Sequence, residues 1–490
     1  MKMTRLYTAF FLLLASYITA FANDISDKLI NSIVYLQISY QSFEQYQPWK
    51  NKELTQGFAV GCAVAENKVI TLASNVANAA FIQARKADRN EFIKAKVLMA
   101  DYESNLALVQ LDSNSLPLPL TPLKFSEKYR KGAPVSFYWL SASGQMYNGR
   151  GFLDRVTVDS ASIFYSKTLL FVTAGISEAT NLGQLYCLNH KPIGIASWSG
   201  KEKEADIIPG KVINRFLADF RDGDYDGIAM KGFETSNLLE PAMRKYLKVP
   251  DAISRGVYVS DVYSIGTGSD ALKPGDVLLS IDGYSINPYG RYKDKQFDIL
   301  PLDYLITSKT AGQKITFELW RDEKIQIISS TAKKFIISDM LVPWYEVDAQ
   351  PEYIIIGGCV LQKLTRSYMM ARGENWEGMM EPHIYHYLVN NAFKPAAERK
   401  EIVILSYCLP ANLNIGYHNM SQTVVDKING MKISSMRDIP EALAGNPDSK
   451  FDVIEFEMDE PAIVLDRAQR KFEETSISQN YGIDKLININ

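Results

Sequence analysis

The stretch Gly61-Cys-Ala-Val-Ala-Glu-Asn-Lys-Val-Ile-Thr71 contains two short runs of small and β-branched residues, separated by the polar pair Glu66-Asn67. β-Branched residues fit a pleated, half-buried surface, and polar residues between two such runs mark a turn. The stretch therefore predicts two neighbouring strands, within residues 57–64 and 68–72.

Similar runs recur through residues 30–220, and turn residues separate most of them. They lie at residues 32–38, 57–64, 68–72, 81–85, 95–100, 106–111, 134–139, 146–158, 162–165, 168–173, 184–187 and 192–197. Many short strands at close spacing are typical of an all-β barrel or sandwich. A short helix is expected at Val212–Phe220, closing this unit.

Two later units share one order of elements: a strand, a strand that ends in Asp-Gly or Asn-Gly, and a further strand, with a helix between the last two. The first unit, 227–335, contains Gly256–Val262, Leu272–Gly283 and Lys314–Arg321. The second unit, 340–470, contains Ile402–Ser406, Val424–Gly430, the expected helix Met436–Leu443 and Phe451–Phe456. A repeated order of elements indicates an internal repeat.

The first 22 residues have the pattern of a signal peptide. Lys2 and Arg5 precede an apolar run at Leu6–Ile18, and Ala20-Phe21-Ala22 forms a cleavage site before Asn23. An uncleaved membrane anchor is the alternative, but the run is shorter than the about 20 residues that span a bilayer. We expect an exported, periplasmic or secreted protein, with no membrane span after signal cleavage.

Composition fits a soluble protein of several domains. The 490 residues are 47% hydrophobic and 22% charged, with a net charge of −3, which gives no electrostatic footprint for nucleic acid. The expected boundaries are 1–22 for the signal peptide, 23–222 for the first domain, 227–335 and 340–470 for the repeated units, and 471–490 for a polar, disordered tail.

Four cysteines and four histidines show no metal-binding spacing. Cys62, Cys187, Cys359 and Cys408 each lie in an apolar, strand-like run, which favours small buried hydrophobic side chains, although export permits disulfides. His190 lies in an expected turn, His383 and His386 are three residues apart without an evident partner, and His418 is isolated. We therefore expect neither a metal nor another cofactor.

Several motifs together resemble the HtrA/Deg family of trypsin-like proteases with PDZ domains. In family order they are Gly61–Thr71, Asp101-Tyr-Glu-Ser-Asn-Leu-Ala-Leu108, Phe171–Gly183, Lys191–Ile195 and Ile208-Pro209. Leu272-Lys-Pro-Gly-Asp-Val-Leu-Leu-Ser-Ile-Asp-Gly283 is similar to the PDZ signature, and Tyr353–Gln362 resembles the second PDZ domain of the plant-type Deg branch. The resemblance implies a mainly β fold: a trypsin-like double β-barrel followed by two PDZ (α+β) domains.

The resemblance also implies a degenerate catalytic triad. The histidine, aspartate and nucleophile positions of the family carry Ser74, Asn105 and Leu182 here. Serine is not basic near neutral pH, asparagine holds no negative charge and leucine has no oxygen. Loss of one triad member lowers turnover by roughly 10⁴–10⁶-fold. In the oxyanion loop, Gly183 is kept, but Gln184 replaces a glycine.

Peptide binding by PDZ domains does not use the catalytic triad, so it is the activity of the resembled family that this sequence is still expected to have. A PDZ domain adds a peptide as a strand and captures its terminal carboxylate with backbone N–H groups. The resemblance assigns this role in the first unit to the loop Tyr225-Asp226-Gly227-Ile228, with Ile228 and Met230 facing the groove, and in the second to Gly357-Gly358. A closed PDZ domain without a free ligand is the alternative.

The sequence therefore predicts a proteolytically inactive protein that binds polypeptides or partner proteins, including C-terminal tails, as a scaffold, chaperone or regulator. Two alternatives stay open: an active serine-type endopeptidase of envelope protein quality control with a non-standard site, and a secreted adaptor protein. Relatives of the family form trimers or larger assemblies, so the resemblance also implies a homo-oligomer.

Overall fold

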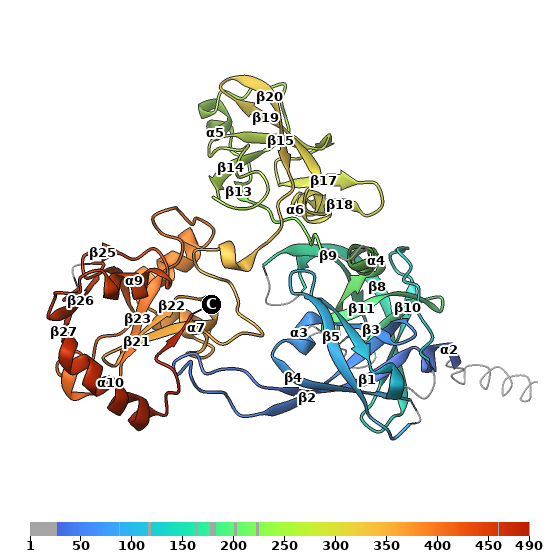
Figure 1. Cartoon of the computed structure of the whole chain (residues 1–490). Coiled ribbons are helices and arrows are strands. Elements are labelled where there is room, and N and C mark those ends of the chain that lie inside the picture. Colours follow the sequence, from blue (N-terminus) through green and yellow to red (C-terminus); the bar gives the residue numbers. More distant parts are fainter. Residues whose placement is uncertain are drawn as a thin grey trace, which may run out of the picture.

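The computed structural model describes residues 27–87, 89–115, 119–161, 165–176, 183–199, 203–221, 225–458 and 460–489. The expected signal peptide and Leu182 lie outside these ranges. Figure 1 shows three bodies: a pair of barrels, a second unit above them and a third unit beside them, in orange and red.

The first barrel contains the two strands predicted around Gly61–Thr71. They are β2 (Thr55–Ala65) and β3 (Lys68–Thr71), which pair antiparallel with Ala65 opposite Lys68. The barrel closes in the order β1-β2-β3-β6-β5-β4. Its other elements are α2 (Asp27–Ile30), β1 (Ile33–Tyr40), α3 (Ala73–Val76), β4 (Ala79–Lys86), β5 (Ile93–Asp101), β6 (Leu106–Leu111) and η1 (Ser113–Ser115).

The second barrel closes in the order β10-β11-β12-β9-β8-β7. Its strands are β7 (Pro134–Leu140), β8 (Met146–Ser160), β9 (Lys167–Ala174), β10 (Leu185–Leu188), β11 (Lys191–Ser199) and β12 (Ala205–Pro209). The predicted closing helix is confirmed as α4 (Gly210–Arg221), which packs against β11 and β12. Apolar residues of both barrels, such as Cys62 and Ile195, belong to one buried cluster.

The second unit is a small sheet in the order β13-β14-β15-β19-β20, with β16 beside β15. Its elements are β13 (Phe233–Ser236), α5 (Pro241–Tyr246), β14 (Val257–Val262), β15 (Val277–Ile281), β16 (Tyr284–Ser285), β17 (Arg291–Asp294), β18 (Asp298–Pro301), α6 (Asp303–Thr307), β19 (Lys314–Arg321), β20 (Lys324–Thr331) and η2 (Ile337–Asp339).

The third unit has a longer sheet in the order β27-β26-β24-β23-β22-β21-β28, with β25 beside β24. Its strands are β21 (Tyr353–Ile356), β22 (Cys359–Lys363), β23 (Val403–Cys408), β24 (Thr423–Ile428), β25 (Met431–Lys432), β26 (Phe451–Phe456), β27 (Ile463–Asp466) and β28 (Ile487–Asn488). Its helical elements are α7 (Arg366–Met370), η3 (Trp376–Met379), α8 (Pro382–His386), the π-helical turn η4 (Tyr387–Asn391), η5 (Asn412–Asn414), α9 (Asp438–Ala444) and α10 (Arg467–Tyr481).

The two units share the pairing that the sequence repeat predicts. The strands β14, β15, β19 and β20 follow one another in the first sheet as β23, β24, β26 and β27 do in the second. The short strands β16 and β25 occupy equivalent places, and α6 and α9 stand at equivalent points of the chain. The predicted fold class, two barrels followed by units with PDZ-like sheets, is confirmed.

The prediction of a disordered tail at 471–490 is wrong. Most of this segment forms α10, and β28 pairs with β21. Asp466 caps the start of α10 by accepting from the Gln469 backbone N–H at 2.8 Å. Gly482 ends the helix with φ 64°, a left-handed conformation that suits glycine. The polar composition reflects a helix with one buried face, where Ile477 is 2% exposed.

The third unit docks on the barrels through the loop between β1 and β2, which reaches it in Figure 1. The Tyr46 hydroxyl donates to the Tyr368 carbonyl at 3.2 Å, and the ring of Trp49 lies edge-on to Tyr353 with 5.9 Å between centroids. The third unit and the barrels are therefore held together by contacts between segments far apart in the sequence.

Candidate functional site

The structure brings Ser74 and Asn105 together, as the sequence comparison predicts. Ser74 lies exposed in the short helix α3, and Asn105 is fully buried in the turn before β6. The Ser74 backbone N–H donates to Asn105 Oδ1 at 2.9 Å, and the Ala73 backbone N–H donates to the Asn105 carbonyl at 3.2 Å. These bonds fix the positions at which the resembled family has its base and its aspartate.

Both the oxygen and the nitrogen of the Asn105 side-chain amide form hydrogen bonds. Its Oδ1 accepts from Ser74, and its Nδ2 donates to the Ala161 carbonyl at 3.0 Å. The Ser197 hydroxyl donates to the same carbonyl. The backbone at Asn105 is left-handed, with φ 53°, which asparagine tolerates better than most residues. The site is built for a neutral amide, because a carboxylate there would face the Ala161 carbonyl without a donor.

Gly183 lies beside the same cluster. Its φ is 87°, and a Cβ added there would lie 3.0 Å from the Val60 carbonyl and 3.5 Å from Thr71 Oγ1. The Gly183 N–H donates to the Ala196 carbonyl at 3.0 Å, and the Gln184 carbonyl accepts from the Ala196 N–H at 2.9 Å. Position 182 lies outside the described residues, so the nucleophile position stays a prediction.

The barrel thiols are poor candidates for a replacement nucleophile. Cys62 and Cys187 are buried and not bonded to each other, and Cys62 Sγ lies 3.8 Å from the Gly183 carbonyl. Burial raises the pKa of Cys187 to about 12 and raises the pKa of Cys62 further. The reactive thiolate is therefore nearly absent at neutral pH.

The histidines lie away from this cluster. His190 is exposed in the turn between β10 and β11, as predicted. The other three are in the third unit: His383 Nε2 lies 3.2 Å from the Gln422 carbonyl, His386 Nδ1 lies 2.9 Å from Asn390 Nδ2, and His418 Nε2 lies 2.8 Å from Asn414 Oδ1. Their ring nitrogens contact amide and carbonyl groups.

The segment 345–348, which the sequence analysis did not single out, packs on residues that flank the Ser74–Asn105 pair. Glu103, 4% exposed, accepts from the Tyr345 hydroxyl at 2.8 Å and from the Ser166 N–H at 2.6 Å. Burial raises the pKa of Glu103. The Asp348 N–H donates to Asn78 Oδ1 at 2.9 Å. The segment that leads into the third unit thus covers the loops on either side of the Ser74–Asn105 pair.

The carboxylate-capture loop predicted in the second unit already holds a carboxylate of the same chain. Asp219, on α4, accepts from the backbone N–H groups of Asp226 and Gly227, both at 3.0 Å. Lys334 Nζ donates to the Tyr225 carbonyl at 2.7 Å. The amides that would capture a peptide terminus are therefore occupied.

The expected groove side chains Ile228 and Met230 face no open groove, and this expectation is corrected. They are 4% and 1% exposed, and the backbone of this segment is already bridged to Thr310 and Lys334. The Ala229 N–H donates to the Lys309 carbonyl at 3.2 Å, just after α6, and the Met230 N–H donates to the Lys333 carbonyl at 2.9 Å. Residues that follow α6 and β20 thus accept from the backbone donors that an added peptide strand would need.

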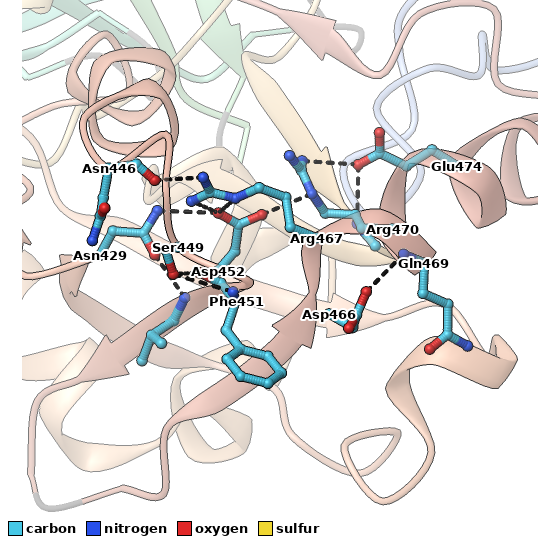
Figure 2. A network of polar contacts seen from close by, with 12 residues as sticks. Asn429, Asn446, Ser449, Phe451, Asp452, Asp466, Arg467, Gln469, Arg470 and Glu474 are labelled. Atoms are coloured by element: carbon cyan, nitrogen blue, oxygen red, sulfur yellow. Dashed lines mark hydrogen bonds and ion pairs between the residues drawn. The ribbon is translucent and has the colours of Figure 1, made fainter.

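The equivalent loop of the third unit is also occupied from within. Glu474 of α10 accepts from the Gly357 N–H at 3.4 Å and from Arg470 at 3.1 Å, within the network in Figure 2. The Gly357 carbonyl accepts from Asn414 Nδ2 at 2.9 Å, and a Cβ on Gly358 would lie 2.5 Å from that same Nδ2. Glu474 occupies the place that a ligand carboxylate was expected to take.

In the described ranges, no helix is long and apolar enough to cross a membrane, and no group of three His, Cys, Asp or Glu side chains is placed to hold a metal ion.

Comparison with known proteins agrees with this architecture. A family model described as a PDZ domain matches residues 342–487. "Protease Do-like 2, chloroplastic" of Arabidopsis thaliana is 26% identical over 465 residues, which cover 93% of this chain and 74% of that protein. "Protease Do-like 4, mitochondrial" of the same plant is 22% identical over 462 residues, covering 92% and 83%.

Among solved structures, "HtrA-type protease AlgW with decapeptide" is similar with a TM-score of 0.47 and 17% identity, covering 63% of this chain and 97% of that one. The PDZ match and the relatives that span nearly the whole chain complete the evidence from the two barrels. The chain is therefore similar over nearly its whole length to Do-like proteases, and residues 342–487 match a PDZ domain.

Proposed function

We propose that this protein is an exported member of the HtrA/Deg family that binds polypeptides without cleaving them. The observation that carries the proposal is the 2.9 Å bond between the Ser74 backbone and the Asn105 side chain. A serine protease needs a base to take the proton of its nucleophile and a carboxylate to orient that base. Ser74 and Asn105 supply neither, and the nearby buried thiols stay protonated.

Polypeptide binding is supported by the PDZ domain at 342–487. PDZ domains bind extended peptides and chain termini, so the proposed partners are polypeptides or proteins with suitable C-terminal tails. The proposed roles are those of a scaffold, chaperone or regulator, in a homo-oligomer of the kind found in the family. The signal-like N-terminus supports a periplasmic or secreted location.

Fluorescein-labelled β-casein tests this proposal, because it is an unfolded polypeptide that also serves as a general protease substrate. With the purified mature chain, fluorescence anisotropy should rise while the casein band stays intact on a gel over several hours. Casein fragments that disappear on substitution of one named Ser or Cys of this chain would overturn the absence of catalysis. Unchanged anisotropy together with intact casein would overturn the binding role.

A further inference from the structure

A cavity of about 380 Å³ opens where the three bodies of the molecule meet. Tyr165 comes from the barrels, Tyr263 from the second unit, and Trp344 and Phe393 from the third. The Phe393 ring centroid lies 4.4 Å from that of Tyr165 and 4.7 Å from that of Tyr263. Aromatic rings from all three units therefore form one wall of the cavity, and no single unit forms this wall alone.

Arg366 projects its charge into this aromatic cavity. Its guanidinium carbon lies 4.6 Å from the Trp344 ring centroid and 6.0 Å from that of Trp376. Within the part of the chain that the structure describes, this guanidinium has no hydrogen-bond acceptor and no carboxylate within 4.0 Å. Burial lowers the pKa of Arg366, although a guanidinium stays charged in proteins.

The carboxylates of the cavity do not neutralise Arg366. Glu234 accepts from the Tyr263 hydroxyl at 2.6 Å and lies 3.4 Å from Lys231 Nζ, so its charge is already balanced. Glu377 is exposed to solvent and acts on Arg366 only at longer range. The cavity thus offers a half-buried guanidinium, two of whose N–H groups can donate in parallel to an added carboxylate.

The remaining wall is apolar and irregular. Leu388 and Val389 lie on the π-helical turn η4, and Val389 is 57% exposed at the cavity. Single π-helical turns are rare and frequently occur at functional sites. An exposed apolar lip beside aromatic rings suits a ligand that carries an apolar side chain next to its charge.

We propose that this cavity binds a polypeptide carboxylate adjacent to an apolar or aromatic side chain. The carboxylate accepts two hydrogen bonds from the Arg366 guanidinium, whose planar fork matches it. The apolar side chain packs among Trp344, Phe393 and Val389. This inference rests on the proposed polypeptide binding. It locates that binding outside the two loops expected to capture a chain terminus, because Asp219 and Glu474 already occupy those loops.

Binding of a labelled hexapeptide to the full mature chain tests the site. Its sequence is Gly-Ser-Gly-Ser-Ala-Phe, with fluorescein at the N-terminus and a free C-terminal carboxylate. Anisotropy should show saturable binding, and C-terminal amidation should weaken it at least about tenfold because it removes the charged acceptor. An amidated peptide with an aspartate before the phenylalanine shows whether a side-chain carboxylate serves equally.

Arg366→Gln should weaken binding of the free-acid peptide at least about tenfold. Arg437→Gln, which removes an exposed arginine of the same unit, is the matched control and should leave affinity unchanged. Glu377→Gln should not weaken binding, because it removes a nearby negative charge. Circular dichroism confirms that each variant folds.

Equal affinity of Arg366→Gln and the unchanged chain for the free-acid peptide overturns the site, as does equal binding of the amidated peptide without aspartate. Labelled casein separates this inference from the broader function. If casein binds but the hexapeptide does not, the site is wrong and the function stands. If the hexapeptide binds through Arg366 but casein does not bind, the site stands and the broader function falls.

Discussion

Asn105 is bonded as an amide and not as a substitute carboxylate. Its oxygen accepts from Ser74, its nitrogen donates to Ala161, and the side chain is fully buried. A carboxylate in place of this amide would set a second acceptor opposite the Ala161 carbonyl. The aspartate found at this position in the resembled family is therefore incompatible with the surroundings seen here.

Asn105→Asp should lower the free energy of unfolding by about 2–3 kcal/mol at neutral pH, because a buried carboxylate loses its donor and faces a carbonyl. Burial should raise the pKa of the new carboxyl in the folded chain above its unfolded value. The loss should therefore be small below the unfolded value, and should grow as pH rises through the folded value.

Urea unfolding measured between pH 4 and pH 8 checks this prediction. Asn189→Asp, in the exposed turn between β10 and β11, is the matched control and should change stability little at any pH. A variant Asn105→Asp as stable at pH 8 as the unchanged chain would show that position 105 accepts a carboxylate.

The C-terminal helix α10 is held against the sheet of the third unit by ion pairs to a buried carboxylate. Asp452 on β26 is 0% exposed and lies 2.8 Å from Arg467 and 2.9 Å from Arg470, both on α10 (Figure 2). Asn429 Nδ2 donates to the same carboxylate at 3.1 Å. The position of α10, and with it the reach of Glu474 to the Gly357 loop, depends on this cluster.

The double variant Arg467→Met/Arg470→Met should destabilise the third unit by about 3–5 kcal/mol, because it leaves Asp452 buried without a cation. Adding Asp452→Asn should recover part of the loss by removing the charge. Thermal unfolding checks both, with the exposed Lys471→Met on the same helix as control. A double variant that unfolds like the control would show that α10 does not depend on these ion pairs.

At the scale of the whole molecule, aromatic contacts from the loop between β1 and β2 join the third unit to the barrels. Tyr46 lies edge-on to Tyr368 with 5.0 Å between ring centroids, and Trp49 contacts Tyr353. Gln362 Nε2 also donates to the Gln45 carbonyl at 2.9 Å. The cavity around Arg366 needs the three bodies in this arrangement, so its binding activity should depend on the docking of the third unit.

Tyr46→Ala/Trp49→Ala should loosen the third unit from the barrels, because each aromatic pair contributes about 0.5–1.5 kcal/mol beyond its buried area. Small-angle X-ray scattering should report a larger radius of gyration, whereas Leu54→Ala, at an exposed position of the same loop, should not. An unchanged scattering profile for the double variant would mean that other contacts hold the units together.

The barrels and the repeated sheets could be predicted from the sequence, because apolar runs and the turn residues between them are local signals of strands and turns. The hairpin at Gly61–Thr71 and the helix α4 are examples. The neighbourhood of Ser74 and Asn105 followed from the resemblance, and their hydrogen bond agrees with it.

The occupied PDZ loops could not be predicted in this way. Asp219 and Glu474 look like ordinary exposed acids of helices, and only the fold places them at the N–H groups of Gly227 and Gly357. The order of residues 471–490 leaves no local signal either, because Asp452, which binds Arg467 and Arg470 at the start of α10, lies 15 or more residues before them in the chain. Contacts between distant segments leave no local pattern.

An activated serine in the barrels would react with a fluorophosphonate, because this reagent labels serines that a neighbouring base has activated. Intact-mass spectrometry of the mature chain after this treatment therefore tests whether the barrels hold such a nucleophile. We predict that the chain keeps its unmodified mass under conditions that label trypsin completely. A stoichiometric adduct on one barrel serine, lost when that serine is changed to alanine, would show that the barrels hold an activated nucleophile.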